Sequence, residues 1–154
     1  MRRFWLAAVA AFAACAVSLT LAAFAASSAP TAFTPASIHW MPGMGDMKGL
    51  QVAMLEGDPS KPGPWTIRLK LPAGTVFPAH HHPDTERVTI ISGSLGFGVG
   101  SKFDASKLTQ FPAGTYAIIP AGVPHFVSTT GGCVIQISGT KPFAMMMEKA
   151  SGGM

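Results

Sequence analysis

The chain has 154 residues, which allows one domain of ordinary size. Apolar residues make up 48% of it, charged residues 12%, and the formal net charge is +4. The sequence has no run of Lys or Arg and no basic patch with interleaved aromatic residues, so we predict no nucleic-acid binding. It also has no Gly-x-Ser-x-Gly, no glycine-rich phosphate loop and no CxxC, which argues against the hydrolase, nucleotide-binding and dithiol classes.

The first 25 residues have the layout of a secretory signal peptide. Arg2 and Arg3 precede an uncharged apolar stretch at residues 4–26, and the small residues Ala23 and Ala25 flank Phe24 as a cleavage site. We therefore expect a periplasmic or secreted protein, with no stable membrane anchor after cleavage. The alternative is an uncleaved anchor, because the stretch is long enough to span a membrane.

Cleavage after residue 25 changes the charge and the cysteine count. Loss of Arg2 and Arg3 leaves nine basic and seven acidic residues, a net charge of +2, so the basic character says little about partners. Cys15 also leaves, and Cys133 then has no intramolecular disulfide partner. Because Cys133 lies in an apolar stretch without a neighbouring thiolate-stabilising group, we interpret it as a packing residue.

The remaining chain divides into an arm, a domain and a tail. Residues 26–49 are rich in Pro, Gly, Ser, Ala and Met and predict an irregular linker, and residues 150–154 predict a flexible tail. Over residues 50–149, short apolar stretches alternate with turns that contain Pro or Gly, which predicts an all-β sandwich or barrel without helices. The stretches are LQVAMLE (50–56), PWTIRLKL (64–71), ERVTIISG (86–93), LGFGVG (95–100), TYAIIP (115–120), HFVSTT (125–130), CVIQISG (133–139) and PFAMMM (142–147).

Three of the five histidines are consecutive, at residues 80–82. On an extended strand, His80 and His82 share one face and His81 points to the other. Glu86 can return a carboxylate from the next strand, and His125 follows the stiff turn PAGVP. We therefore predict that His80, His82, Glu86 and His125 bind one divalent transition metal ion, with Fe, Mn, Ni, Cu and Zn left open.

These two segments resemble the paired motifs of the cupin superfamily, and the resemblance spans residues 74–125. It implies a double-stranded β-helix, or jelly-roll barrel, with the metal in its lumen. Thr129 stands where the second motif often has Asn. The phrases EGDPSKPGPWTIRLKLPAG and PAGVPHFV are also similar to those of small single-domain bacterial cupins, including the cupin domain of ChrR-type anti-sigma factors. The matching positions are Gly74, His80, His81, His82, Glu86 and Gly93 in the first motif, and Gly114, Pro120, Gly122 and His125 in the second.

The resemblance leaves three functions open. The first is an exported mononuclear metalloenzyme that acts on a small molecule by dioxygenation, isomerisation or lysis. The second is a non-catalytic binding or sensing module for a small-molecule ligand. The third is copper(I) handling in the periplasm, which depends on the methionines Met41, Met44, Met47, Met145, Met146 and Met147. We expect an apolar lumen, because Val88 and Ile90 share the face of Glu86 while Val123 and Val127 share that of His125. A homodimer is compatible with the sequence, which does not fix the oligomeric state.

Overall fold

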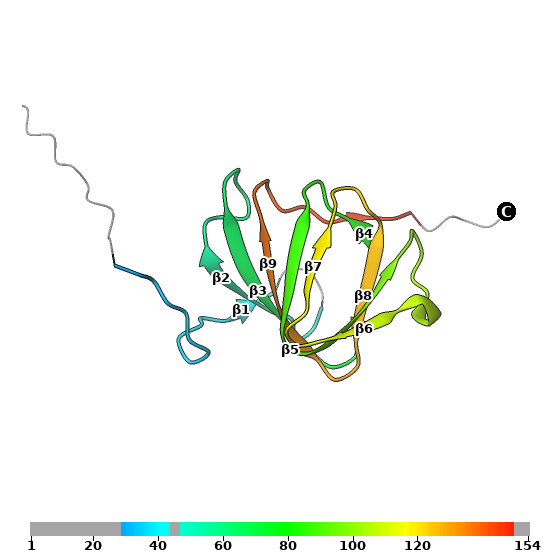
Figure 1. The fold of residues 1–154 in the computed structure, drawn as a ribbon, viewed down its shortest axis with the longest axis horizontal. Coiled ribbons are helices and arrows are strands. Elements are labelled where there is room, and N and C mark those ends of the chain that lie inside the picture. The colour runs from blue at the N-terminus through cyan, green and yellow to red at the C-terminus, as the bar shows by residue number, and fades with distance from the viewer. Residues whose placement is uncertain (1–28, 44–46, 150–154) are drawn as a thin grey trace, which may run out of the picture. The chain divides into compact units, whose positions relative to one another are not determined.

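The computed structural model describes residues 29–43 and 47–149, so the predicted signal peptide (1–25) and tail (150–154) lie outside it (Figure 1). The chain divides into two units, Met1–Ala32 and Phe33–Met154, and every strand lies in the second unit. Within the described ranges, no helix has the length and apolar character that crossing a membrane requires.

The described residues form ten β-strands and one 3-10 helix, η1, at Ala105–Lys107. This confirms the all-β class predicted from the alternating stretches. The strands are β1 (Met41–Pro42), β2 (Gln51–Glu56), β3 (Trp65–Leu71), β4 (Thr75–His81), β5 (Glu86–Val99), β6 (Thr109–Pro112), β7 (Tyr116–Ile119), β8 (His125–Thr129), β9 (Cys133–Gly139) and β10 (Met146–Met147).

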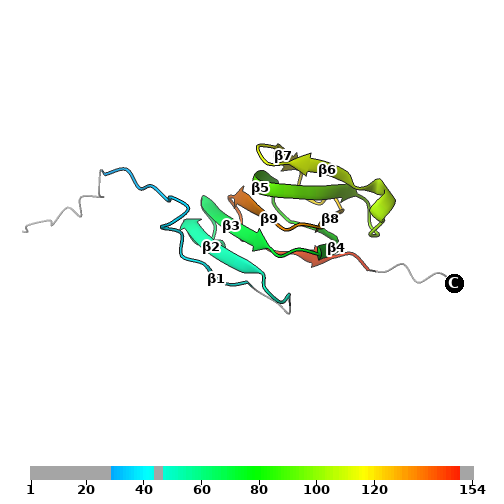
Figure 2. The same cartoon turned by 90° about the horizontal axis from the view of Figure 1, so that it is seen from below.

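The strands form two antiparallel sheets that share β5 and together make a half-barrel (Figures 1 and 2). One sheet has the order β1-β2-β3-β9-β5-β7 and the other has the order β10-β4-β8-β5-β6. The first half of β5 pairs with β7 and β9, and the second half, from Ser94 on, pairs with β6 and β8. One strand therefore passes from the first sheet into the second.

Gly93 lies where β5 changes sheets. Its φ is +75°, a conformation that glycine adopts without the steric penalty of a side chain. A Cβ atom at this position would collide with the carbonyl oxygen of Gly132. The other motif glycines, Gly74, Gly114 and Gly122, also have positive φ. The glycines of both motifs are thus required by the backbone that brings the histidines together.

The core lies between the two sheets and is built by alternation along the strands. In β9, Cys133, Ile135 and Ile137 are buried, whereas the intervening residues are partly exposed. β-branched side chains suit such half-buried strands. Trp65 closes one end of the core, with its Nε1–H donating to the carbonyl of Lys141 at 2.7 Å.

Four strand predictions differ from the structure. The stretches at 86–93 and 95–100 form the single strand β5, because Gly93 bends the strand without ending it. No strand was predicted at β6, and β4 was expected only around His80 and His81; both strands contain proline. It also placed residues 26–49 in an irregular arm, yet β1 lies there and pairs with β2. A two-residue strand has no alternation of its own and is defined by its partner.

Candidate metal centre

The ladder between β4 and β8 places two histidines opposite each other. His80 and His125 are cross-strand partners, and Phe77 is the partner of Val127. Between these two pairs, β4 therefore has two residues, Pro78 and Ala79, whereas β8 has only one. This is a β-bulge, and proline suits it because a bulged residue has no ladder hydrogen bond to donate.

The other two predicted ligands lie on either side of the next turn. His82 follows β4 directly and Glu86 opens β5. The turn is held in place from two sides: the N–H of Gly122 donates to the carbonyl of His82 at 2.9 Å, and Asp84 accepts the N–H of Thr85 at 2.9 Å. His82 and Glu86 thus face the same interior as His80 and His125.

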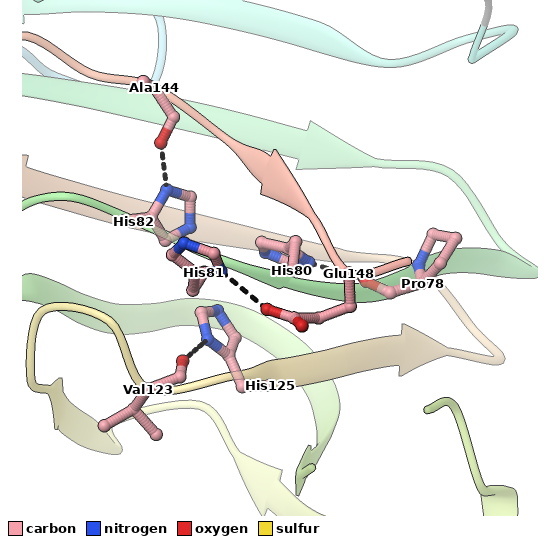
Figure 3. A network of polar contacts seen from close by, with 8 residues as sticks. All are labelled: Pro78, His80, His81, His82, Val123, His125, Ala144 and Glu148. Atoms are coloured by element: carbon pink, nitrogen blue, oxygen red, sulfur yellow. Dashed lines mark hydrogen bonds and ion pairs between the residues drawn. The ribbon is translucent and has the colours of Figure 1, made fainter. Parts of the chain in front are cut away.

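Each buried imidazole is fixed by a hydrogen bond from Nδ1–H to a backbone carbonyl (Figure 3). A carbonyl oxygen only accepts, so Nδ1 carries the proton and Nε2 keeps its lone pair when the ring is neutral. This is the tautomer that a metal-binding histidine needs. The bonds run from His80 to Pro78 (2.7 Å), from His82 to Ala144 (2.7 Å) and from His125 to Val123 (3.0 Å).

The remaining lone pairs converge on one point. The three histidines are buried and offer ligand atoms that all lie within 4.8 Å of one another. The Glu86 carboxylate oxygens lie 3.7 Å from Nε2 of His82 and 3.5 Å from Nε2 of His125. Nε2 of His82 is buried and has no hydrogen-bond partner. Because neutral Nε2 atoms and carboxylate oxygens all accept, these residues fit a cation placed among them.

Burial and the neighbouring charges set the protonation of the cluster. Burial lowers the pKa of His80 to about 4. The positive forms of His125 and His82 also lower this pKa, whereas the hydrogen bond to the Pro78 carbonyl opposes the shift. Burial also lowers the pKa of His125, but its contacts with Glu86 and the Val123 carbonyl outweigh burial and raise that pKa overall. His80 is therefore neutral near pH 7, which is the ligand form.

His81 points away from the cluster, as the strand alternation predicts. It is absent from the group of three converging histidines, and its Nδ1–H donates to Oε1 of Glu148 at 2.6 Å (Figure 3). His39 is exposed and likewise lies outside the group. The structure thus groups three of the four predicted residues, His80, His82 and His125, and leaves these two histidines out. Glu86 is not in the group, although its carboxylate lies within 3.7 Å of two of its members.

A cavity with a volume of about 60 Å³ opens beside the cluster. Of the described residues that line it, Thr115 is the only polar one apart from His80, His82, Glu86 and His125, so the prediction of an apolar lumen is confirmed. Val88, Ile90 and Val127 line the cavity, but Val123 does not: it packs against the core, and its carbonyl orients His125. Four phenylalanines also line it: Phe77, Phe97, Phe111 and Phe143.

Residues 143–145 also contribute to the site, and the sequence did not predict this. The Phe143 ring packs on His82 with 5.1 Å between ring centroids, the Ala144 carbonyl accepts from His82, and Met145 lines the cavity. These residues come about sixty positions after the first motif, and no pattern in the sequence connects them to it. The only signal in the sequence is that the stretch PFAMMM, which follows the last full strand, is apolar.

Two smaller predictions can also be compared with the structure. Thr129 is buried and its hydroxyl donates to the carbonyl of Ser94 at 2.8 Å, so it ties β8 to β5 where the motif often has Asn. Cys133 is buried, which confirms its packing role, and burial raises the pKa of its thiol. Of the methionines considered for copper(I), Met41 and Met47 pack against the core, and Met44 lies outside the described residues.

Solved structures with a similar fold include two small proteins and a larger cupin. The polyketide cyclase RemF from Streptomyces resistomycificus matches with a TM-score of 0.65 at 15% identity, covering 80% of this chain and 89% of that one. KdgF from Halomonas sp. matches at 0.55 and 14% identity, covering 72% and 95%. An RmlC-like cupin from Ralstonia eutropha matches at 0.57 and 21% identity, covering 72% and 68%. At these identities the likeness concerns the fold alone.

The sequence comparisons give one family and no individual relative. No curated protein sequence matches the chain significantly. The family model described as the ChrR Cupin-like domain matches residues 28–142, which is well over half of the 154 residues. Together with the cupin fold and the buried histidines at the positions of both motifs, this match establishes that the chain belongs to the ChrR cupin-like family.

Proposed function

We propose that the protein binds one divalent transition metal ion through Nε2 of His80, His82 and His125 and the carboxylate of Glu86. The observation that supports this most strongly is the convergence of three buried imidazoles beside a carboxylate, with Nε2 of His82 buried and without a hydrogen-bond partner among the described residues. Imidazole and carboxylate ligands suit Fe, Mn, Ni, Cu and Zn, so the ligand set does not select among these metals. The three carbonyl bonds to Nδ1 fix each imidazole in the ligating tautomer.

We further propose that the protein is an exported metalloenzyme acting on a small oxygenated molecule. A bound metal with open coordination positions supplies Lewis-acid or O2 chemistry. The chain's own residues exclude water and present an apolar wall, which favours a compact substrate with one polar end. Thr115 is the only other polar lining residue, so the wall offers no second acid–base pair and leaves the chemistry to the metal.

The family match favours a second candidate, a non-catalytic module that binds or senses a small molecule. The matching family is described as the ChrR Cupin-like domain, and the sequence resembles the cupin domain of ChrR-type anti-sigma factors. A regulatory domain of that kind needs a ligand-dependent change without turnover. The two candidates differ in what happens after ligand binding. An enzyme consumes its ligand, whereas a sensing module returns it unchanged.

The test begins with the metal content of protein purified from its native compartment. Co(II)-loaded protein is then titrated with small anions and diols while the visible spectrum is followed, because Co(II) reports changes in its coordination. A spectral response supports open positions. No response to any small oxygen donor would end the enzyme proposal, since a structural metal is saturated by protein ligands. O2 uptake against phenols, diketones and sugars then separates turnover from binding.

A further inference from the structure

A C-terminal strap, residues 140–148, crosses the cavity and is held firmly at its beginning. Asp84 Oδ2 accepts the N–H groups of Thr140 and Lys141 at 2.8 and 2.9 Å. The N–H of Phe143 donates to Pro59 at 2.7 Å, and its ring meets Trp65 edge to face with 5.7 Å between centroids. The strap is therefore anchored up to Ala144, whose carbonyl holds His82.

The second half of the strap, residues 145–148, is held by far fewer contacts. Its strand β10 makes only two ladder pairs with β4, and the N–H of Glu148 donates to Ala79 at 2.9 Å. Met145, Met146 and Met147 are 40%, 46% and 52% exposed. Among the described residues, the side-chain hydrogen bond of this half is that of Glu148 to His81, at 2.6 Å. This half is therefore held by a short backbone ladder and by one side-chain contact that a substitution can remove.

The cavity is small for a ligand as large as a benzene ring. Its volume is about 60 Å³, whereas a cavity known to bind benzene has roughly 150 Å³, so displacement of a lining side chain would make room for such a ligand. Most of the lining comes from strands paired over at least four residues, such as β3 with β9 and β4 with β8. Met145 is the lining residue that lies in the weakly held half of the strap.

We propose that residues 145–148 form a lid over the metal cavity, hinged at Ala144 and latched by the hydrogen bond between His81 and Glu148. Met145 is the side chain of the lid that limits ligand size. The inference rests on the proposed metal site for its ligand, and on the strap alone for its motion. It also gives each histidine of the run a role: His80 and His82 face the metal, and His81 holds the lid shut.

Ligand access is tested on Co(II)-loaded protein, with acetate as the small probe and benzoate as the large one. Glu148→Ala removes the latch, and we expect benzoate to associate about fivefold faster in stopped-flow experiments, as befits the loss of one hydrogen bond. Met145→Ala enlarges the cavity and should raise benzoate affinity while acetate affinity stays unchanged. Glu148→Gln is the matched control, because its amide oxygen still accepts from His81. Unchanged benzoate binding in both Ala variants would overturn the lid.

Lid opening is tested independently by hydrogen exchange on metal-free protein. The peptide covering residues 144–149 should exchange faster than peptides from β4 and β8, and Glu148→Ala should accelerate it about fivefold more than Glu148→Gln does. If the protein binds no metal but shows this exchange, the proposed metal function fails and the lid stands. If the 144–149 peptide is as protected as β4 in every variant, the lid fails whatever the metal result.

Discussion

Two of the buried histidines are oriented by their own strands, whereas the third is oriented from a distant part of the chain. The Nδ1 atoms of His80 and His125 donate to carbonyls two residues earlier, at Pro78 and Val123. His82 donates to Ala144, 62 residues away. The first two bonds form as soon as β4 and β8 adopt their local backbone, but the third needs the strap to be docked. The centre therefore has two parts: a wall, formed by β4 and β8 with their histidines, and a remote support, the strap at Ala144.

The largest expected effect comes from removing the side chain of a proposed metal ligand. His125→Ala, and equally His80→Ala, His82→Ala or Glu86→Ala, should lower metal occupancy by about an order of magnitude or more. His81→Ala is the matched control and should leave occupancy nearly unchanged, because its side chain faces Glu148 instead of the cavity. Elemental analysis after dialysis measures both. Equal loss in the His81 variant would show that the inner and outer faces of the strand have been misassigned.

Removing the remote support should have a smaller effect than removing a ligand. A chain that ends after Phe143 lacks the Ala144 carbonyl, so His82 loses the acceptor that fixes its tautomer. We expect metal affinity to fall about tenfold, a typical effect for a partner that orients a metal ligand. A competition titration with a chelating dye measures it, and a chain that ends after Lys149 is the control. Unchanged affinity would mean that His82 is held well enough by its own strand.

The fixed end of the strap can be weakened without touching the cavity. Hydrogen bonds from the backbone of Thr140, and then of Lys141 and Thr85, lower the pKa of Asp84 to about 2. A lowered carboxyl pKa stabilises the fold above the unfolded value, about pH 4, and this contribution is lost as the pH falls through about 2. Asp84→Asn should therefore cost about 1 kcal/mol at pH 7, because these bonds lie near the surface.

Urea denaturation at pH 7 and at about pH 2 measures this change. The difference between the wild-type protein and Asp84→Asn should be present at the higher pH and largely absent at the lower one. A difference that grows toward acid would contradict the assignment of Asp84 as an ionised acceptor for the strap.

The smallest expected effects come from chemical modification of native residues. They compare the accessibility of the core with that of the lid. Cys133 lies in the core on β9, and burial raises the pKa of its thiol, although a hydrogen bond with Thr129 opposes this. Its reaction with a thiol reagent near pH 8 should be roughly tenfold or more slower than in urea. The exposed Met146 and Met147 should be oxidised by peroxide before any buried side chain reacts. Peptide mapping measures the modification of each site separately. Rapid labelling of native Cys133 would show that the core opens as readily as the lid.

The wall was largely predictable from the sequence, and the remote support was not. Alternating stretches indicated β2, β3, β7, β8 and β9, and the spacing of the two motifs indicated which side chains meet. The bulge at Pro78 was not predictable, because it depends on how β4 pairs with β8. The carbonyls of Ala144 and Val123 were not predictable either, since every residue has a carbonyl and only the fold selects which ones orient a ring.

The sharing of β5 between the two sheets has a consequence for how the chain folds. Neither sheet is complete without β5, and its partner β9 also pairs with β3, which lies nearly seventy residues earlier. Six of the nine strand pairings join strands that are not neighbours in the sequence, which is characteristic of domains that fold in milliseconds to seconds. An N-terminal fragment ending before β8 lacks His125 and half of the partners of β5. During synthesis, therefore, the fold waits until nearly the whole domain has been made, and the histidine cluster is completed in the same late step.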